Sequence, residues 1–310
     1  MLKAKRTLAA LSAALLFFLS GCGVSTGTGG EPDIPMRAEE ARVSYLGPAG
    51  TYTEEAAQFF FPSGVLRPQA SVAEAIEDVL RGEADYAVIP QENTVGGAVT
   101  GYVDALIGEE SVSVAGEVIL PISQTLMGVP GASLDDIRTV CSHAQGIAQS
   151  AAWREQYLPG AVTQEMASTA AAASYVAEVG DKSIAAVAAP GAAELYGLTV
   201  LARNVQITDA NKTRFYVLSL SQAEGKVQTR AVFVAVCGAG RIDDIIVAIH
   251  NTGCELVTIH DRPEGSRLGT YNYILEVENE GGIPEKLLKA MEAFPEVRFA
   301  GRFNAVEKQG

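Results

Sequence analysis

Asn211-Lys212-Thr213-Arg214-Phe215 stands where a polar loop meets an apolar run, residues 215–220, that predicts a buried strand. Strand and helix patterns alternate on the N-terminal side of this run, throughout residues 41–220. Such alternation indicates an α/β fold rather than a helical bundle or a β-sandwich. At the start of the strand, Thr213 offers a small hydroxyl and Arg214 a planar fork that suits a carboxylate. A solvated strand edge would carry the same pair, so the chemistry depends on which other polar groups lie nearby.

The composition restricts the classes of function. The 310 residues are 48% hydrophobic, enough for a sizeable core and more than one folded unit. A formal charge of −14 disfavours a nucleic-acid-binding surface. Four cysteines without a Cys-x-x-Cys spacing, together with three histidines, predict no metal site. We expect buried free thiols at positions 141, 237 and 254; a bridge between two of them is the alternative.

The N-terminus predicts a targeting segment. A basic start and an apolar run up to residue 19 give residues 1–21 the pattern of a signal peptide. Its end, Leu19-Ser20-Gly21-Cys22, resembles the bacterial lipobox, in which the cysteine is lipidated. Residues 22–40 then form a flexible tether. We expect an extracytoplasmic protein that is lipid-anchored to the bacterial membrane; an uncleaved anchor or a fortuitous cysteine is the alternative.

A first polar turn follows the predicted strand 42–46. Gly50 permits a tight turn, and Thr51 with Glu54 forms a capping box for the next helix. The free N–H groups of a helix start attract anions. The same pattern also occurs as a purely structural turn.

A second polar cluster follows the predicted strand 85–90, which ends at a proline. Glu92, Asn93 and Thr94 lie directly after it. Ligands of open α/β sheets bind at the carboxyl ends of strands. An exposed polar turn is the alternative.

A third cluster follows the predicted strand 138–141. Ser142 and Gln145 form a capping box, which places His143 in the first helical turn. We expect Ser142 and Gln149 to line a cleft and His143 to be a surface residue.

The cleft follows from the path of the chain, which leaves one lobe near residue 120 and returns near residue 200. Within the second lobe, Ser168 and Thr169 cap the alanine-rich helix 170–178.

After a linker over residues 221–228, a second pattern begins. It reads strand, helix, strand, strand, helix, strand over residues 231–236, 242–251, 255–261, 270–278, 284–293 and 297–301. This βαββαβ order is the ferredoxin-like arrangement, which more often binds a regulator or partner than performs chemistry.

The motifs together resemble the prephenate dehydratase family over about residues 41–220. The matches are Gly47-Pro48-x-Gly50-Thr51-Tyr52-Thr53, Ile89-Pro90-x-Glu92-Asn93-Thr94, Ser142-His143-x-Gln145 with Gln149, Ser168-Thr169-Ala170, Ala193-x-x-Tyr196-Gly197-Leu198 and Asn211-x-Thr213-Arg214-Phe215.

The resemblance implies a two-lobed α/β catalytic domain, residues 41–221, like type II periplasmic binding proteins, with its second lobe at about 120–200. A ferredoxin-like ACT domain, residues 228–305, follows. The implied activity is conversion of prephenate to phenylpyruvate, with loss of water and carbon dioxide, in L-phenylalanine biosynthesis. No metal or organic cofactor is implied. We expect a homodimer or homotetramer.

Residue roles follow from the same resemblance. Thr213 would donate a proton to the leaving hydroxyl, a general-acid role. The other candidate catalytic residues are Asn93, Gln149 and Ser142. The candidate substrate-binding residues are Gly50, Thr51, Glu92, Thr94, Ser168, Thr169, Arg214 and Phe215. Arg214 could instead support the fold, and Glu92 could orient Asn93 or pair with Arg214.

The C-terminal unit departs from the family pattern. A Glu-Ser-Arg-Pro motif that the family's regulatory domain carries is here His260-Asp261-Arg262-Pro263. The bulkier, charged side chains lead us to expect weak or absent L-phenylalanine binding, with the unit kept for dimer contacts. A membrane-tethered solute-binding protein for an aromatic or dicarboxylic acid is the alternative function.

Overall fold

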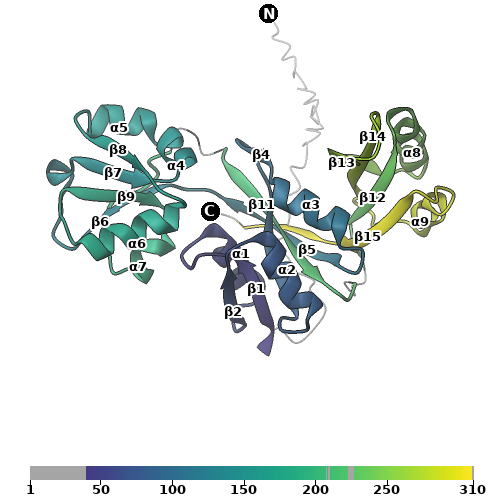
Figure 1. The fold of residues 1–310 in the computed structure, drawn as a ribbon, viewed down its shortest axis with the longest axis horizontal. Coiled ribbons are helices and arrows are strands. Elements are labelled where there is room, and N and C mark those ends of the chain that lie inside the picture. Colours follow the sequence, from purple (N-terminus) through teal and green to yellow (C-terminus); the bar gives the residue numbers. More distant parts are fainter. Residues whose placement is uncertain (1–39, 207, 209, 223–226, 309–310) are drawn as a thin grey trace, which may run out of the picture.

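The computed structural model describes residues 40–206, 208, 210–222 and 227–308. The predicted signal peptide, the tether and Cys22 lie outside these residues. The described residues form three β-sheets, which lie one after another along the long axis of the molecule (Figure 1). No helix within that part of the chain is long and apolar enough to cross a bilayer.

The first sheet occupies the middle of the molecule and has the strand order β16-β5-β11-β3-β1-β2, with β4 paired to β3. Helices α1, α2 and α3 belong to the same part of the chain. The bounds are β1 (Arg42–Leu46), α1 (Tyr52–Phe60), β2 (Val65–Gln69), α2 (Val72–Leu80), β3 (Tyr86–Asn93), β4 (Gly97–Ala98), α3 (Thr100–Gly108), β5 (Ser113–Pro121), β11 (Lys212–Ser219) and β16 (Ala305–Glu307).

The second sheet is reached after β5 and left before β11, as the sequence predicts for a second lobe. Its order is β10-β6-β9-β7-β8. The bounds are β6 (Thr125–Gly128), the 3-10 turn η2 (Leu134–Asp136), β7 (Thr139–Ser142), α4 (Ala144–Gln149), α5 (Ala151–Tyr157), β8 (Val162–Glu165), α6 (Thr169–Val179), β9 (Ile184–Ala188), α7 (Gly191–Leu195) and β10 (Thr199–Ala202).

The third sheet has the order β13-β14-β12-β15, and its elements follow the predicted βαββαβ order. One face packs on α8 and α9, and the other contributes Val232, Val234 and Ile274 to a core shared with α2 and α3. The bounds are β12 (Arg230–Gly238), α8 (Ala239–Asn251), β13 (Glu255–Pro263), β14 (Thr270–Glu278), α9 (Glu285–Met291) and β15 (Val297–Phe303).

Strand β3 runs further than expected. The prediction ended it at Pro90, but pairing with β11 continues through Asn93. The register skips one residue, so that Arg214 faces Glu92 while Phe215 faces Pro90. Gln91 is therefore the extra residue of a β-bulge, where a proline without an N–H is tolerated.

Two helix starts agree with their predicted caps, since the side chains of Thr51 and Ser168 accept hydrogen bonds from the backbone N–H groups three residues on. Ser71 caps α2 in the same way. Helix α6 ends at Gly180, which adopts the left-handed conformation that glycine tolerates best. The cysteines at 141, 237 and 254 are buried and free, as expected.

Candidate active site

A cavity of about 300 Å³ lies between the first and second sheets. Both lobes contribute to its wall. The lining residues are Leu46, Tyr52, Thr53, Asn93, Ile122, Gln124, His143, Gln145, Gly146, Gln149, Ala167, Ser168, Thr169, Asn211 and Thr213.

Asn93 is the most connected polar group in this wall. Its Oδ1 accepts hydrogen bonds from the backbone N–H groups of Val95 and Gly96, both at 2.9 Å. Since those groups can only donate, they fix which way the amide faces. Its Nδ2 must then point to β11, where it donates to Thr213 Oγ1 at 2.8 Å and to Asn211 Oδ1 at 2.9 Å.

Thr213 lies directly opposite Asn93 in the β3–β11 ladder and is 8% exposed. Its hydroxyl oxygen is engaged as an acceptor by Asn93. A hydroxyl that accepts on one side keeps its own proton for another partner. The geometry therefore leaves Thr213 able to donate to a group in the cavity.

Two buried polar atoms in the wall lack a hydrogen-bond partner among the described residues. They are Nδ2 of Asn211, a residue that is 1% exposed, and Oε1 of Gln124. Buried polar groups are rarely left unpaired, because each costs the free energy of its lost hydration. Both residues line the cavity, so one unpaired donor and one unpaired acceptor lie in or behind its wall. We did not predict either residue; Asn211 stands two positions before Thr213, which is the signal that could have identified it.

Helix α4 corrects the prediction for the Ser142 region. The N-cap is His143, whose Nδ1 accepts from the Gln145 N–H at 3.3 Å. Ser142 is fully buried and donates to the Val187 carbonyl at 2.7 Å, so its hydroxyl does not face the cavity. His143 is exposed, as predicted, and it also lines the cavity.

The two glutamines of α4, Gln145 and Gln149, form hydrogen bonds with other residues of the cavity wall. Gln149 lines the cavity as predicted, and its Oε1 accepts from Gln124 at 3.0 Å. Gln145 reaches across from the second lobe and donates to Asn93 Oδ1 at 3.2 Å. The lobes therefore meet at Asn93 across the cavity.

The starts of α1 and α6 contribute Tyr52 and Thr53, and Ser168 and Thr169, to the wall. Helix N-termini favour anions. No Lys or Arg occurs among the described residues that line the cavity. Helix starts, amides and hydroxyls must therefore meet any negative charge there.

The turn before α1 takes a structural role. The Gly50 N–H donates to Glu54 Oε2 at 2.6 Å, and Thr51 accepts from the Glu54 N–H at 3.3 Å. Neither Gly50 nor Thr51 is part of the cavity wall. We therefore place the candidate anion-binding position at the next two residues, Tyr52 and Thr53, which line the cavity.

Other predicted binding residues lie away from the cavity. Phe215 is buried in the core of the first sheet. Thr94 Oγ1 accepts from the Lys212 N–H at 3.0 Å. Arg214 contacts Glu92 at 3.3 Å, and Glu117 and Glu276 more closely. Arg214 thus supports the fold, and Glu92 pairs with it.

The altered motif lies at the end of β13. His260 packs edge-on against Tyr102 of α3, and burial lowers the pKa of its imidazole. Arg262 forms an ion pair with Asp104 of α3 at 2.7 Å. Asp261 and Pro263 complete the strand. Two of the four residues are thereby committed to contacts with the first lobe.

A family model described as prephenate dehydratase matches residues 43–223. The chain belongs to the prephenate dehydratase family. A prephenate dehydratase from Amycolatopsis methanolica is 35% identical over 273 residues, 85% of this chain and 88% of that one. The activity is the conversion of prephenate to phenylpyruvate in phenylalanine biosynthesis, a carbon–oxygen lyase reaction.

Solved structures agree with the family match. The crystal structure of a prephenate dehydratase in complex with L-Phe from Arthrobacter aurescens has a TM-score of 0.77 at 29% identity, over 85% of this chain and 89% of that one. GqqA, described as a novel type of quorum quenching acylase, has a TM-score of 0.76 at 26% identity, over 85% of this chain and 97% of that one. A shared fold does not fix an activity. The prephenate dehydratase assignment therefore rests on the family match.

Proposed function

We propose that prephenate is dehydrated and decarboxylated in the cavity between the lobes, with Thr213 as proton donor to the leaving hydroxyl. The observation that carries this role is the hydrogen bond from Asn93 Nδ2 to Thr213 Oγ1. It fixes the oxygen as an acceptor and directs the hydroxyl proton elsewhere. Thr213 faces the cavity, so that proton is available to a substrate there.

Besides this proton, the reaction requires the protein to hold the substrate in place. The bond from the ring to its carboxylate breaks, and its electron pair enters the ring as carbon dioxide leaves. The bond from the ring to its hydroxyl breaks, and that oxygen departs as water after it takes a proton. A threonine hydroxyl is a weak acid, so its contribution comes from placement at the departing oxygen.

The carboxylates of prephenate require donors, and the wall supplies them without a cationic cluster. The starts of α1 and α6 face the cavity from opposite lobes, and Asn211 Nδ2 adds a buried donor. An anion bound by such groups keeps its charge in a partly dehydrated site. Ser168, Thr169 and Gln149 are the remaining predicted contacts in the wall.

Thr213→Val tests the proton donor. Valine keeps the shape of the side chain and removes the hydroxyl, so turnover should fall by about 100-fold or more. Thr213→Ser restores a hydroxyl and should recover most of the rate. Phenylpyruvate formation from prephenate is the measurement, with thermal unfolding as the control for folding. Near-normal turnover in the valine variant would remove Thr213 from the mechanism.

Two finer assignments of fold also belong to this proposal: the two lobes form a cleft like that of type II periplasmic binding proteins, and the C-terminal unit is an ACT domain.

The ion pair between Arg262 and Asp104 supports weak L-phenylalanine binding by the C-terminal unit. L-Phenylalanine added to the same assay should leave the rate unchanged. Micromolar binding by calorimetry would contradict this. Dimer or tetramer contacts are assigned to the same unit, and sedimentation reports the assembly.

The N-terminal segment supports a lipid anchor at Cys22 and an extracytoplasmic location. Cys22→Ala should release the protein from the membrane fraction, and globomycin should block removal of residues 1–21. A wild-type chain that is unprocessed and found away from membranes would contradict the assignment.

A further inference from the structure

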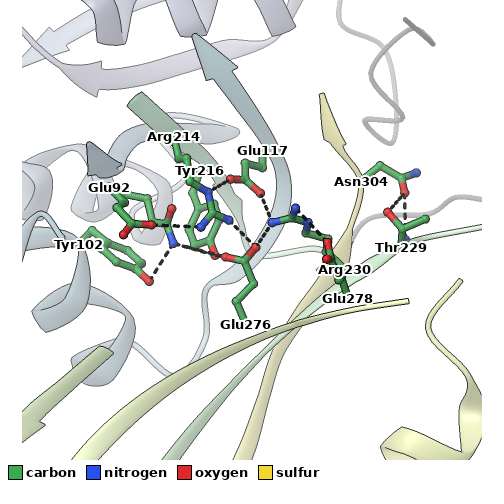
Figure 2. Close-up of polar contacts among 11 residues, drawn as sticks. Glu92, Tyr102, Glu117, Arg214, Tyr216, Thr229, Arg230, Glu276, Glu278 and Asn304 are labelled. Carbon is green, nitrogen blue, oxygen red and sulfur yellow. Dashed lines mark hydrogen bonds and ion pairs between the residues drawn. The ribbon is translucent and has the colours of Figure 1, made fainter. Parts of the chain in front are cut away.

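The third sheet reaches the active-site strands through a cluster of charged side chains (Figure 2). At its centre the Arg214 guanidinium meets carboxylates from β3, β5 and β14, which are Glu92, Glu117 and Glu276. Among these three, Glu276 alone comes from the C-terminal unit.

Glu276 is fully buried, and its carboxylate has partners on every side. Its Oε1 accepts from Arg214 and Arg230, and its Oε2 accepts from the Tyr216 hydroxyl and from Gln91 at 3.3 Å. Burying a carboxylate is costly unless it is paired and hydrogen-bonded. A well-packed apolar contact would often stabilise such an interface as much, so the network calls for a role beyond stability.

The position of Arg214, next to Thr213 on β11, indicates what this role is. Thr213 and Arg214 are consecutive on β11, so their side chains point to opposite faces of the sheet. The ladder places Thr213 opposite Asn93 and Arg214 opposite Glu92. One cross-strand pair therefore faces the cavity, while the next faces the C-terminal unit.

We propose that Glu276 is a positioning residue for the dehydratase reaction: by holding Arg214 it fixes the start of β11 and places the Thr213 hydroxyl in the cavity. The proposal rests on the proton-donor role of Thr213. It makes the C-terminal unit part of the support of the active site. A displacement of β14 is then transmitted to Thr213 through one ion pair and one peptide unit.

Glu276→Gln tests the ion pair with little change of shape. Turnover should fall about tenfold or more while KM changes less than about threefold, because the groups that bind the substrate carboxylates are untouched. Glu278→Gln is the matched control. Glu278 lies two residues along the same strand and pairs with Arg230 at 3.1 Å, so its variant should keep wild-type turnover. A wild-type rate in Glu276→Gln, or an equal loss in both variants, would overturn the proposal.

A double-mutant cycle with Thr213→Val separates positioning from a general effect on the fold. If Glu276 acts through the Thr213 hydroxyl, Glu276→Gln should lower turnover in the wild type but change it less than about threefold in the valine background. Equal losses in both backgrounds would show that Glu276 acts by another route. Should Thr213→Val alone leave turnover normal, the proton-donor role fails independently of Glu276.

Arg214→Lys provides a second route if Glu276→Gln does not fold. Lysine keeps a positive charge among the three carboxylates and loses the planar fork that contacts them together. Its turnover should fall, again with little further loss in the valine background. Full turnover in a folded Arg214→Lys enzyme, or losses that simply multiply with those of Thr213→Val, would overturn the proposal.

Discussion

Ser168 has two tasks, because it caps α6 and also lines the cavity. Ser168→Asp separates them. Aspartate is as good an N-cap as serine, so the free energy of unfolding should stay within about 1 kcal/mol. The added negative charge should repel a dianionic substrate and raise KM for prephenate about tenfold or more.

The matched control is Ser71→Asp. Ser71 caps α2 in the same way, with its hydroxyl accepting from the Glu74 N–H at 3.1 Å, but it does not line the cavity. Steady-state kinetics and urea unfolding of both variants distinguish the cap from the charge. Equal KM values in the two variants would place Ser168 outside the substrate site.

Individual residues were predictable where the motif and the direction of the side chain agreed. Asn93, Gln149 and Thr213 line the cavity as expected. Ser142 does not, because its hydroxyl turns inward to a carbonyl of β9. A residue's place at a strand end is evident from sequence, but the face it points to depends on packing. The packing around Ser142 illustrates this dependence, because a Cβ on the neighbouring Gly146 would lie only 2.3 Å from the Ser142 hydroxyl oxygen.

Among the elements, the bulge at Gln91 decides which side chains reach the cavity. Along β11, Thr213 and Phe215 point to one face, and Arg214 and Tyr216 to the other. Strict alternation on β3 would point Asn93 to the same face as Gln91, which contacts Glu276. The extra residue interrupts this alternation, so the Asn93 side chain points to the same face of the sheet as Thr213.

The pattern of apolar residues predicted most helices and strands, but it did not predict to which face of the sheet the Asn93 side chain points. The predicted order of the C-terminal unit matches the structure, since its strands and helices have clear apolar patterns. Proline at position 90 suggested a strand end, yet the bulge accommodates it. Strands β2, β4, β8, β10 and β16 were not predicted. Their residues are exposed or half-buried, and β4 and β16 are only Gly97–Ala98 and Ala305–Glu307.

At the scale of the whole molecule, the charged cluster joins the C-terminal unit to the catalytic lobe. Two buried carboxylates there, those of Glu117 and Glu276, share two guanidinium groups, those of Arg214 and Arg230. Burial and the nearby charge of Glu276 raise the pKa of Glu117 to about 7. The folded protein therefore retains a proton that the unfolded chain loses at lower pH.

The sign of the pH dependence follows from this raised pKa. The stability contributed by protonated Glu117 is complete below the ordinary carboxyl pKa and is lost as pH rises through about 7. Glu117→Gln does not titrate. The free energy of unfolding of the wild type should therefore fall relative to the variant by about 1 kcal/mol or more between pH 5 and 8.

Urea unfolding at several pH values measures this difference. Glu255, an exposed residue on β13, gives a control substitution that changes the net charge equally. Parallel pH profiles for the wild type and Glu117→Gln would contradict the prediction.

The short strand β16 pairs in parallel with β5, alongside Glu117, Val118 and Ile119. Because β16 lies far downstream of β5 in the sequence, β5 leaves the ribosome long before its partner exists. Until then the backbone of β5 is an open sheet edge, which favours pairing with other chains. The sheet that carries Thr213 is completed only once residues 305–307 have been translated, so a chain that terminates before them cannot complete it.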